Sequence, residues 1–92
     1  MTTVHIPAPL RHLTEGAEQV TVTIPPGQQR TVRELLTELE QRHPGLMAEL
    51  TEAGELSPYL AVFVDGEQAG MGLQTKITEE NEVFFLAPVA GG

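Results

Sequence analysis

The sequence predicts a single α+β domain, in which one main helix packs against a mixed β-sheet. Segments near both ends of the chain alternate apolar with polar residues, as strands with one buried face do. Between them lies a stretch with the apolar spacing of a helix, and a capping signal precedes it. The order strand, strand, helix, short helix and three further strands leaves the helix free to cover one face of the sheet.

The first two predicted strands are expected to form a hairpin. Val4 and Ile6 alternate with polar neighbours, and the strand ends at Pro7, because proline cannot donate a hydrogen bond to a neighbouring strand. In residues 20–24, valine and isoleucine alternate with threonine, which predicts a second half-buried strand. A polar connection over residues 14–19 joins the two.

The main helix is expected to begin at Val32. Thr31 and Glu34 can form a capping box, in which each side chain accepts a hydrogen bond from a backbone N–H that would otherwise be unpaired. The helix should end near His43, because the residue before a proline is driven away from helical dihedrals. Its apolar face has the spacing i, i+3, i+4 and i+7 and consists of Val32, Leu35, Leu36 and Leu39.

The segment after this helix contains shorter predicted elements. Residues 46–50 indicate a short helical turn, and residues 51–58 indicate an exposed loop. A strand over residues 60–64 then runs into Asp65-Gly66, which is a turn signal because both central positions of the favoured hairpin turn need positive φ.

The last predicted strand covers residues 82–87 and runs directly into small residues at the end of the chain. We therefore expect a folded domain of residues 1–87 and a flexible tail of residues 88–92. No internal repeat is visible in the sequence.

Composition and charge exclude several classes of function. The 92 residues include no cysteine, so any sulfur chemistry must come from another molecule. The 13 acidic and 5 basic residues give a net charge of -8, which repels phosphate backbones and anionic lipids. No apolar run is long enough to cross a bilayer. We expect a cytoplasmic protein that binds neither nucleic acid nor membranes, whose acidity serves either solubility or steering toward a basic protein surface.

The sequence shows no recognisable set of catalytic, metal-binding or cofactor-binding residues. His5, His12 and His43 have no shared metal-ligand spacing and are expected to pack or to face solvent. No glycine-rich stretch precedes the Lys-Ser or Lys-Thr pair of a phosphate-binding loop. The glutamates are expected on helix and loop surfaces. We therefore expect that the chain is not an enzyme and binds no cofactor or metal itself.

The end of the chain is the most informative feature. A terminal glycine pair arises by chance in roughly 0.5% of chains at the background glycine frequency. Gly91 and Gly92 have no side chains, so they can enter a narrow channel and present a terminal carboxylate inside another protein. A carboxylate is a poor electrophile, and sulfur can attack it only after its conversion to a mixed anhydride such as an acyl-adenylate. The alternative is a frayed terminus without function.

Three stretches resemble the ubiquitin-like sulfur carrier family, which includes the molybdopterin synthase small subunit, the thiamine-pathway carrier and the cysteine-biosynthesis carrier. They are VFFLAPVAGG over residues 83–92, RHPGL over residues 42–46, and VFVDG over residues 62–66. The family often has Val-Asn where this chain has Val64-Asp65. The resemblance implies a β-grasp, or ubiquitin-like, fold with four to five strands on one main helix, and with the first and last strands central and parallel.

Within this family, the sequence is most similar to the cysteine-biosynthesis branch. The similar features are IPAPLR over residues 6–11, Thr14, Gly16 and the long connection over residues 51–58. The molybdopterin-type carrier and a carrier for a secondary-metabolite pathway remain alternatives.

The resemblance also implies a mechanism. An adenylating enzyme of the ubiquitin-activating type would form an acyl-adenylate on Gly92, and a sulfur donor would convert it to a thiocarboxylate. The acceptor would be a PLP-dependent cysteine synthase-like enzyme, followed by a zinc metallopeptidase, or else a protein like the molybdopterin synthase large subunit. ATP, PLP and zinc would belong to these partners. The tail that enters the partner's active site would consist of Pro88, Val89, Ala90 and Gly91.

Alternation in the last strand sends apolar residues to both faces of the sheet, and only one face can meet the helix. We expect Phe84 and Leu86, with Phe63 of the neighbouring strand, to form an exposed patch that docks partners. The alternative is that Leu10 and the 51–58 connection cover these residues.

Two other functions are consistent with the same sequence. A ubiquitin-like binding module would dock through the same face without covalent modification of Gly92. A protein modifier would instead be attached through Gly92 to lysines of other proteins.

Overall fold

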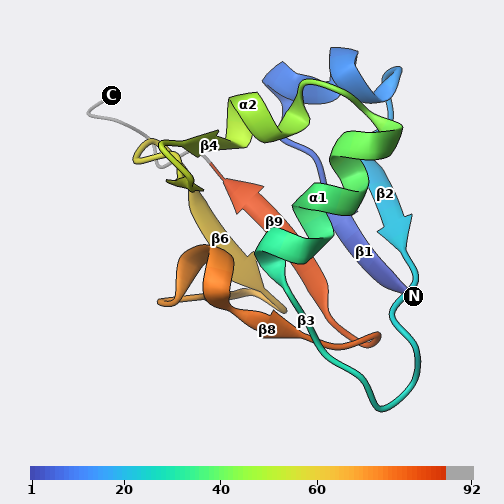
Figure 1. Ribbon diagram of the computed structural model, residues 1–92. Coiled ribbons are helices and arrows are strands. Elements are labelled where there is room, and N and C mark those ends of the chain that lie inside the picture. Colours follow the sequence, from blue (N-terminus) through green and yellow to red (C-terminus); the bar gives the residue numbers. More distant parts are fainter. Residues whose placement is uncertain (87–92) are drawn as a thin grey trace.

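The computed structural model describes residues 1–86 and shows a five-stranded sheet with helix α1 across one face (Figure 1). The strand order is β2-β1-β9-β6-β7. The strands are β1 Thr2–His5, β2 Gln19–Val22, β6 Ala61–Val64, β7 Glu67–Gln68 and β9 Glu82–Leu86. Ala87, which was predicted to end the last strand, and the predicted tail of residues 88–92 lie outside the described residues.

The two central strands come from opposite ends of the described chain. β1 pairs with β9 in parallel, with His5 opposite Phe84, whereas β2 and β6 pair antiparallel with β1 and β9 respectively. This confirms the mixed sheet with central, parallel first and last strands that the resemblance implied. The hairpin predicted between the first two strands is also confirmed.

Helix α1 (Val32–Arg42) begins where the capping signal predicted. Thr31 Oγ1 accepts a hydrogen bond from the Glu34 N–H at 3.1 Å, and Glu34 Oε1 accepts one from the Thr31 N–H at 2.8 Å. The buried face of the helix is the predicted one, formed by Val32, Leu35, Leu36 and Leu39. These side chains share one core with Val4 and Val83 of the central strands.

Glu40 holds the junction between α1 and the short helix α2 (Leu46–Leu50). Its carboxylate accepts hydrogen bonds from the backbone N–H groups of Gly45, at 3.0 Å, and Met47, at 2.8 Å. These bonds, with that of Gly45 the stronger influence, hold the pKa of Glu40 below its ordinary value, because they stabilise the charged carboxylate. The helical turn predicted over residues 46–50 is confirmed.

The exposed loop predicted over residues 51–58 is a small hairpin for most of its length. β4 (Thr51–Glu52) pairs antiparallel with β5 (Glu55–Leu56). Its turn places Ala53 at φ 53° and Gly54 at φ 82°. Ala-Gly is a weak turn signal, because alanine rarely adopts positive φ, and the sequence alone therefore favoured a loop.

The Asp65-Gly66 turn, predicted from its sequence, has the expected positive φ at both positions, 51° and 87°. Aspartate and glycine tolerate this backbone region better than other residues do, so this signal is stronger than Ala-Gly.

Four further elements carried no clear sequence signal. Two are short 3-10 helices, η1 (Ala8–Thr14) and η2 (Gly72–Gln74). The others are a two-residue strand pair, β3 (Arg30–Thr31) with β8 (Lys76–Ile77). Each strand of this pair finds its partner far along the chain, so no local pattern predicts it.

Candidate functional site

The predicted carrier terminus, Gly92, and the predicted tail of Pro88, Val89, Ala90 and Gly91 lie outside the described residues. The structure describes the strand that leads to them. β9 has a neighbour on each side, β1 and β6, and its last residue, Leu86, lies opposite Ala61. The two neighbours fix the path of β9 within the part of the chain that the structure describes, which ends at Leu86.

The start of β9 is held by Asp65. Its Oδ1 accepts a hydrogen bond from the Glu82 N–H at 2.9 Å, and its own N–H donates to the Glu82 carbonyl oxygen at 2.9 Å. The Asn81 side-chain amide donates to Asp65 Oδ2. Asn81 Oδ1 in turn accepts a hydrogen bond from the Thr78 N–H at 2.7 Å. Sequence reasoning identified Asp65 only as a turn residue and missed this network, which anchors the strand.

Residues of β9 alternate between the two faces of the sheet as predicted. Val83 and Phe85 are buried in the core, whereas Phe84 is half-buried on the opposite face and Leu86 is 47% exposed there. Phe63 of β6 lies directly opposite Phe84 in the ladder. The structure thus places Phe63, Phe84 and Leu86, here called the open-face patch, on one face of the sheet.

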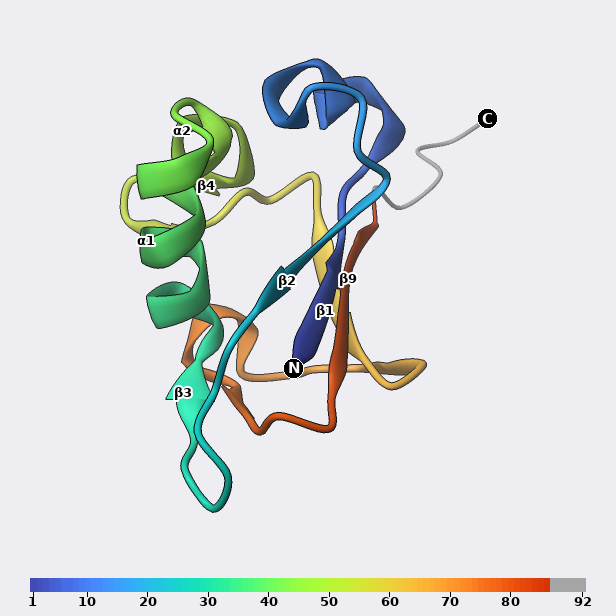
Figure 2. The same ribbon diagram turned by 90° about the vertical axis from the view of Figure 1, so that its right-hand side faces the viewer.

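The alternative that other segments cover the open-face patch is not supported within the described residues. Leu10 and Leu56, from the two connections in question, pack against the buried core. Figure 2 shows α1 and α2 together on one side of the sheet. The alternation of β9 places the open-face patch on the face opposite the buried Val83 and Phe85. Within the described residues, Leu86 is exposed and Phe63 and Phe84 are half-buried, and the docking role of the patch remains a prediction.

His5 joins the open-face patch, which sequence reasoning did not anticipate. Its ring stacks on Phe84 with centroids 3.9 Å apart and an interplanar angle of 4°. Its Nε2 lies 3.7 Å from Glu82 Oε1 and makes no hydrogen bond within the described residues. The alternation of β1 could have revealed this position, since His5 must face away from its buried neighbours Val4 and Ile6.

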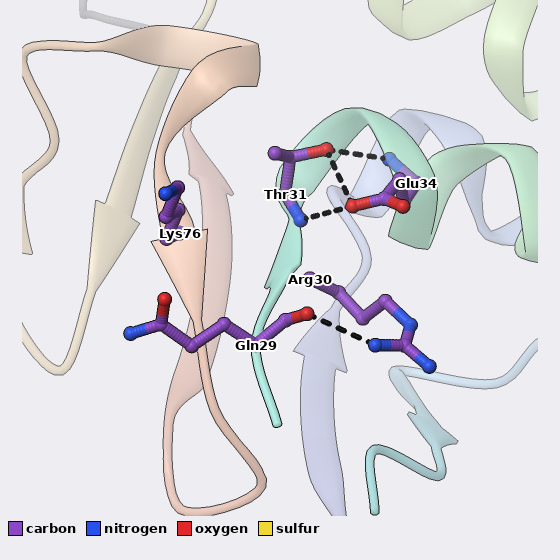
Figure 3. Close-up of a pocket in the computed structure, with 5 residues that line it drawn as sticks. All are labelled: Gln29, Arg30, Thr31, Glu34 and Lys76. Atoms are coloured by element: carbon purple, nitrogen blue, oxygen red, sulfur yellow. Dashed lines mark hydrogen bonds between the residues drawn. The ribbon is translucent and has the colours of Figure 1, made fainter. Parts of the chain in front are cut away.

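A polar pocket of about 170 Å³ lies between β3, β8 and the start of α1 (Figure 3). It is lined by Gln29, Arg30, Thr31, Glu34 and Lys76. The Glu34 carboxylate is occupied by the capping box, and the Thr31 N–H holds the pKa of Glu34 below its ordinary value. The pocket thus contains a helix cap and carries no catalytic arrangement.

Residues 1–86 contain no cluster of three or more histidine, cysteine, aspartate or glutamate side chains that could hold a metal ion. His5, His12 and His43 lie on β1, on η1 and after α1, respectively. No helix in the same part of the chain is both long and apolar enough to span a membrane.

Known proteins similar to this chain include carriers and modifiers. The model of the ThiS family matches residues 4–92. The chain is 34% identical over 64 residues to small archaeal modifier protein 3 of Haloferax volcanii, covering 67% of this chain and 70% of that protein. It is 37% identical over 65 residues to a candidate sulfur carrier protein of Archaeoglobus fulgidus, covering 67% of this chain and 74% of that protein.

A solved structure is similar over its whole length. It is a chain in the crystal structure of the Amycolatopsis orientalis BexX/CysO complex, with 32% sequence identity, a TM-score of 0.85 and coverage of 100% of both chains.

Proposed function

Because the chain belongs to the ThiS family of ubiquitin-like sulfur carriers, we propose that it carries sulfur as a thiocarboxylate on Gly92. The observation that carries this proposal is that the family match extends through Gly91 and Gly92. The course of β9 supports it, since this strand is held on both sides and its last described residue, Leu86, is close in sequence to these glycines. In this role the chain is a co-substrate of its partner enzymes and has no catalytic residue of its own.

The chemistry takes place in two steps on a partner enzyme of the ubiquitin-activating type. A carboxylate oxygen of Gly92 attacks the α-phosphorus of ATP, pyrophosphate leaves, and an acyl-adenylate forms. A hydrosulfide ion then attacks the carbonyl carbon and the bond to AMP breaks, which yields the thiocarboxylate, AMP and a proton. The tail from Pro88 to Gly91 spans the distance between the folded domain and that active site.

We favour the cysteine-biosynthesis branch for the acceptor. The motif of residues 6–11 supports this choice, as does the likeness to a chain of the BexX/CysO complex. The acceptor enzyme would then be a PLP-dependent synthase, and a zinc metallopeptidase would release the product. A molybdopterin synthase large subunit-like acceptor or a secondary-metabolite enzyme is the alternative. In each of these versions, any ATP, PLP or zinc that the pathway uses would be bound by the partner enzymes and not by this chain.

The open-face patch is the surface that we assign to docking of these partners. Phe84 and Phe63 lie opposite each other, and Leu86 exposes about half of its side chain at the end of β9. A partner that covers Leu86 lies next to the start of the tail, so docking and tail insertion can occur together. A partner that buries these apolar side chains gains affinity from the removal of apolar surface from water, and no ion pair is needed.

Intact mass spectrometry tests the carrier function directly. The chain is incubated with the adenylating enzyme of its own host, ATP and sodium sulfide. We expect the mass to rise by the difference between a sulfur and an oxygen atom, and a variant that lacks Gly92 should show no rise. An unchanged mass with the matched enzyme would contradict the carrier function and favour the non-covalent binding module. The mass of the protein isolated from its host also shows whether Gly92 is its last residue.

A second function is favoured by the likeness to small archaeal modifier protein 3. A protein modifier would form an isopeptide bond between Gly92 and lysines of other proteins. In extracts of the host, such adducts would appear as conjugates of higher mass, and trypsin, whose last cleavage site in this chain follows Lys76, would leave residues 77–92 attached to the modified lysine. A carrier would instead be recovered as free chain, with or without sulfur.

A further inference from the structure

A second hollow of the surface, larger and more apolar than the one beside α1, lies near the end of β9. Its volume is about 260 Å³. The side chains around it come from η1 and the residue before it, from α2, and from the loop that precedes β6. They are Pro7, Pro9, Leu10, Glu49, Ser57, Tyr59 and Leu60.

This hollow, here called the end pocket, lies beside the described end of β9. Leu60 directly precedes Ala61, which lies opposite Leu86. On the other side of β9, β1 pairs His5 with Phe84, and Pro7 follows His5 by two residues. Figure 2 shows η1 and α2 at the same end of the sheet as the end of β9. A protein that binds at the described end of β9 would lie close to the rim of the end pocket.

The end pocket combines apolar walls with one charge. Proline and leucine side chains form most of the lining, and Glu49 supplies its only carboxylate. Glu49 is exposed and has no ion pair within the described residues. The basic residue next to Leu10 in sequence, Arg11, is not part of the lining, and its Nε donates to the Ile6 carbonyl oxygen at 3.0 Å. The charge of Glu49 is therefore available to a partner.

Tyr59 adds an aromatic ring at the rim. It is 77% exposed, which is unusual for a large apolar side chain in this protein. An arginine side chain suits such a site, because its methylene groups pack on apolar walls while its guanidinium group pairs with a carboxylate and stacks on an aromatic face. The net charge of -8 would also attract a basic partner surface from a distance.

We propose that the end pocket receives an arginine side chain of the protein that accepts the tail. This inference rests on the proposed function in one respect: the arginine is assigned to a partner that accepts the tail. The arginine would fix the carrier's orientation on its partner at the base of the tail, independently of the open-face patch. Glu49 and Tyr59 would be its positioning residues, and neither would take part in the chemistry at Gly92.

The test uses the full chain and a small probe, so it does not depend on activation of Gly92. Nα-acetyl-arginine amide is titrated into the ¹⁵N-labelled chain, and its uncharged analogue Nα-acetyl-norleucine amide is titrated in parallel. We expect amide shifts centred on Leu10, Glu49, Tyr59 and Leu60, with tighter binding of the arginine probe. Glu49→Gln should weaken arginine binding by about two- to fivefold, as expected for an exposed ion pair, and leave norleucine binding unchanged.

Glu52→Gln is the matched control, because it removes the same charge from an exposed residue of the neighbouring hairpin that does not line the pocket. It should leave arginine binding unchanged. Equal effects of the two substitutions would show general attraction to an acidic surface and would overturn the proposal. Norleucine binding as tight as arginine binding, or shifts scattered over the whole surface, would overturn it as well. The mass test of Gly92 is independent of this titration. A negative titration would therefore not contradict the carrier function, and an unchanged mass would not contradict arginine binding in the end pocket.

Discussion

Replacing Leu86 with aspartate should separate docking from folding, because this side chain is 47% exposed and lies outside the buried core. The substitution places a carboxylate in the open-face patch at the last described position of β9. Because a partner would have to bury this charge against its own apolar surface, we expect sulfur loading to fall strongly. The side chain points away from the core, so the fold should survive.

The cost to folding can be worked from exposure. A fully buried leucine contributes about 1.5–3 kcal/mol, and Leu86 is already 47% exposed in the free protein, so its loss should cost about 1 kcal/mol. A domain of 92 residues is expected to have a free energy of unfolding of about 5–14 kcal/mol. The Leu86→Asp variant should therefore remain folded at room temperature.

Two measurements on the same sample test this reasoning. Urea unfolding followed by circular dichroism gives the free energy of unfolding, and the intact mass after incubation with the activating enzyme gives the sulfur-loaded fraction. Met71→Asp is the control, because it makes the same chemical change at a residue that is 66% exposed and outside the open-face patch. Unfolding of the Leu86→Asp variant, or equal loss of loading in both variants, would refute the assignment of this patch to docking.

Three further predictions concern stability and are measured by urea unfolding. Phe85→Ala removes a core side chain only one position away from Leu86 and should cost about 3–5 kcal/mol; a cost below that of Leu86→Ala would contradict the assigned faces of β9. The pKa of Glu40 is lowered in the folded protein, so its stabilising contribution is full above the ordinary pKa of glutamate and is lost as the pH falls through the lowered value. Glu40→Gln should therefore reduce the loss of stability in acid. An unchanged dependence of the free energy of unfolding on pH would contradict this role of Glu40. Gly66→Ala forces alanine to φ 87° and should cost about 1–2 kcal/mol, whereas Gly70→Ala, at an open position without positive φ, should cost clearly less.

Much of the fold follows from local patterns in the sequence. Thr31 and Glu34 predict where α1 begins, because the capping box uses residues only three positions apart. The alternation in β9 predicts which side chains enter the core, since the period of a strand is a local property. Asp65-Gly66 predicts its turn for the same reason, because the required φ values depend on these residues themselves.

The sequence by itself thus determined the main helix, the principal strands and the two-faced character of β9, and it contains the glycine pair from which the carrier function is proposed. Only the tertiary structure decided which strands are neighbours, that His5 stacks on Phe84, that Asp65 anchors the start of β9, and that Glu49 and Tyr59 line one pocket with residues of η1. The physical reason is separation along the chain. Contacts between residues tens of positions apart depend on the packing of the whole domain around one core, and no short stretch of sequence records that packing.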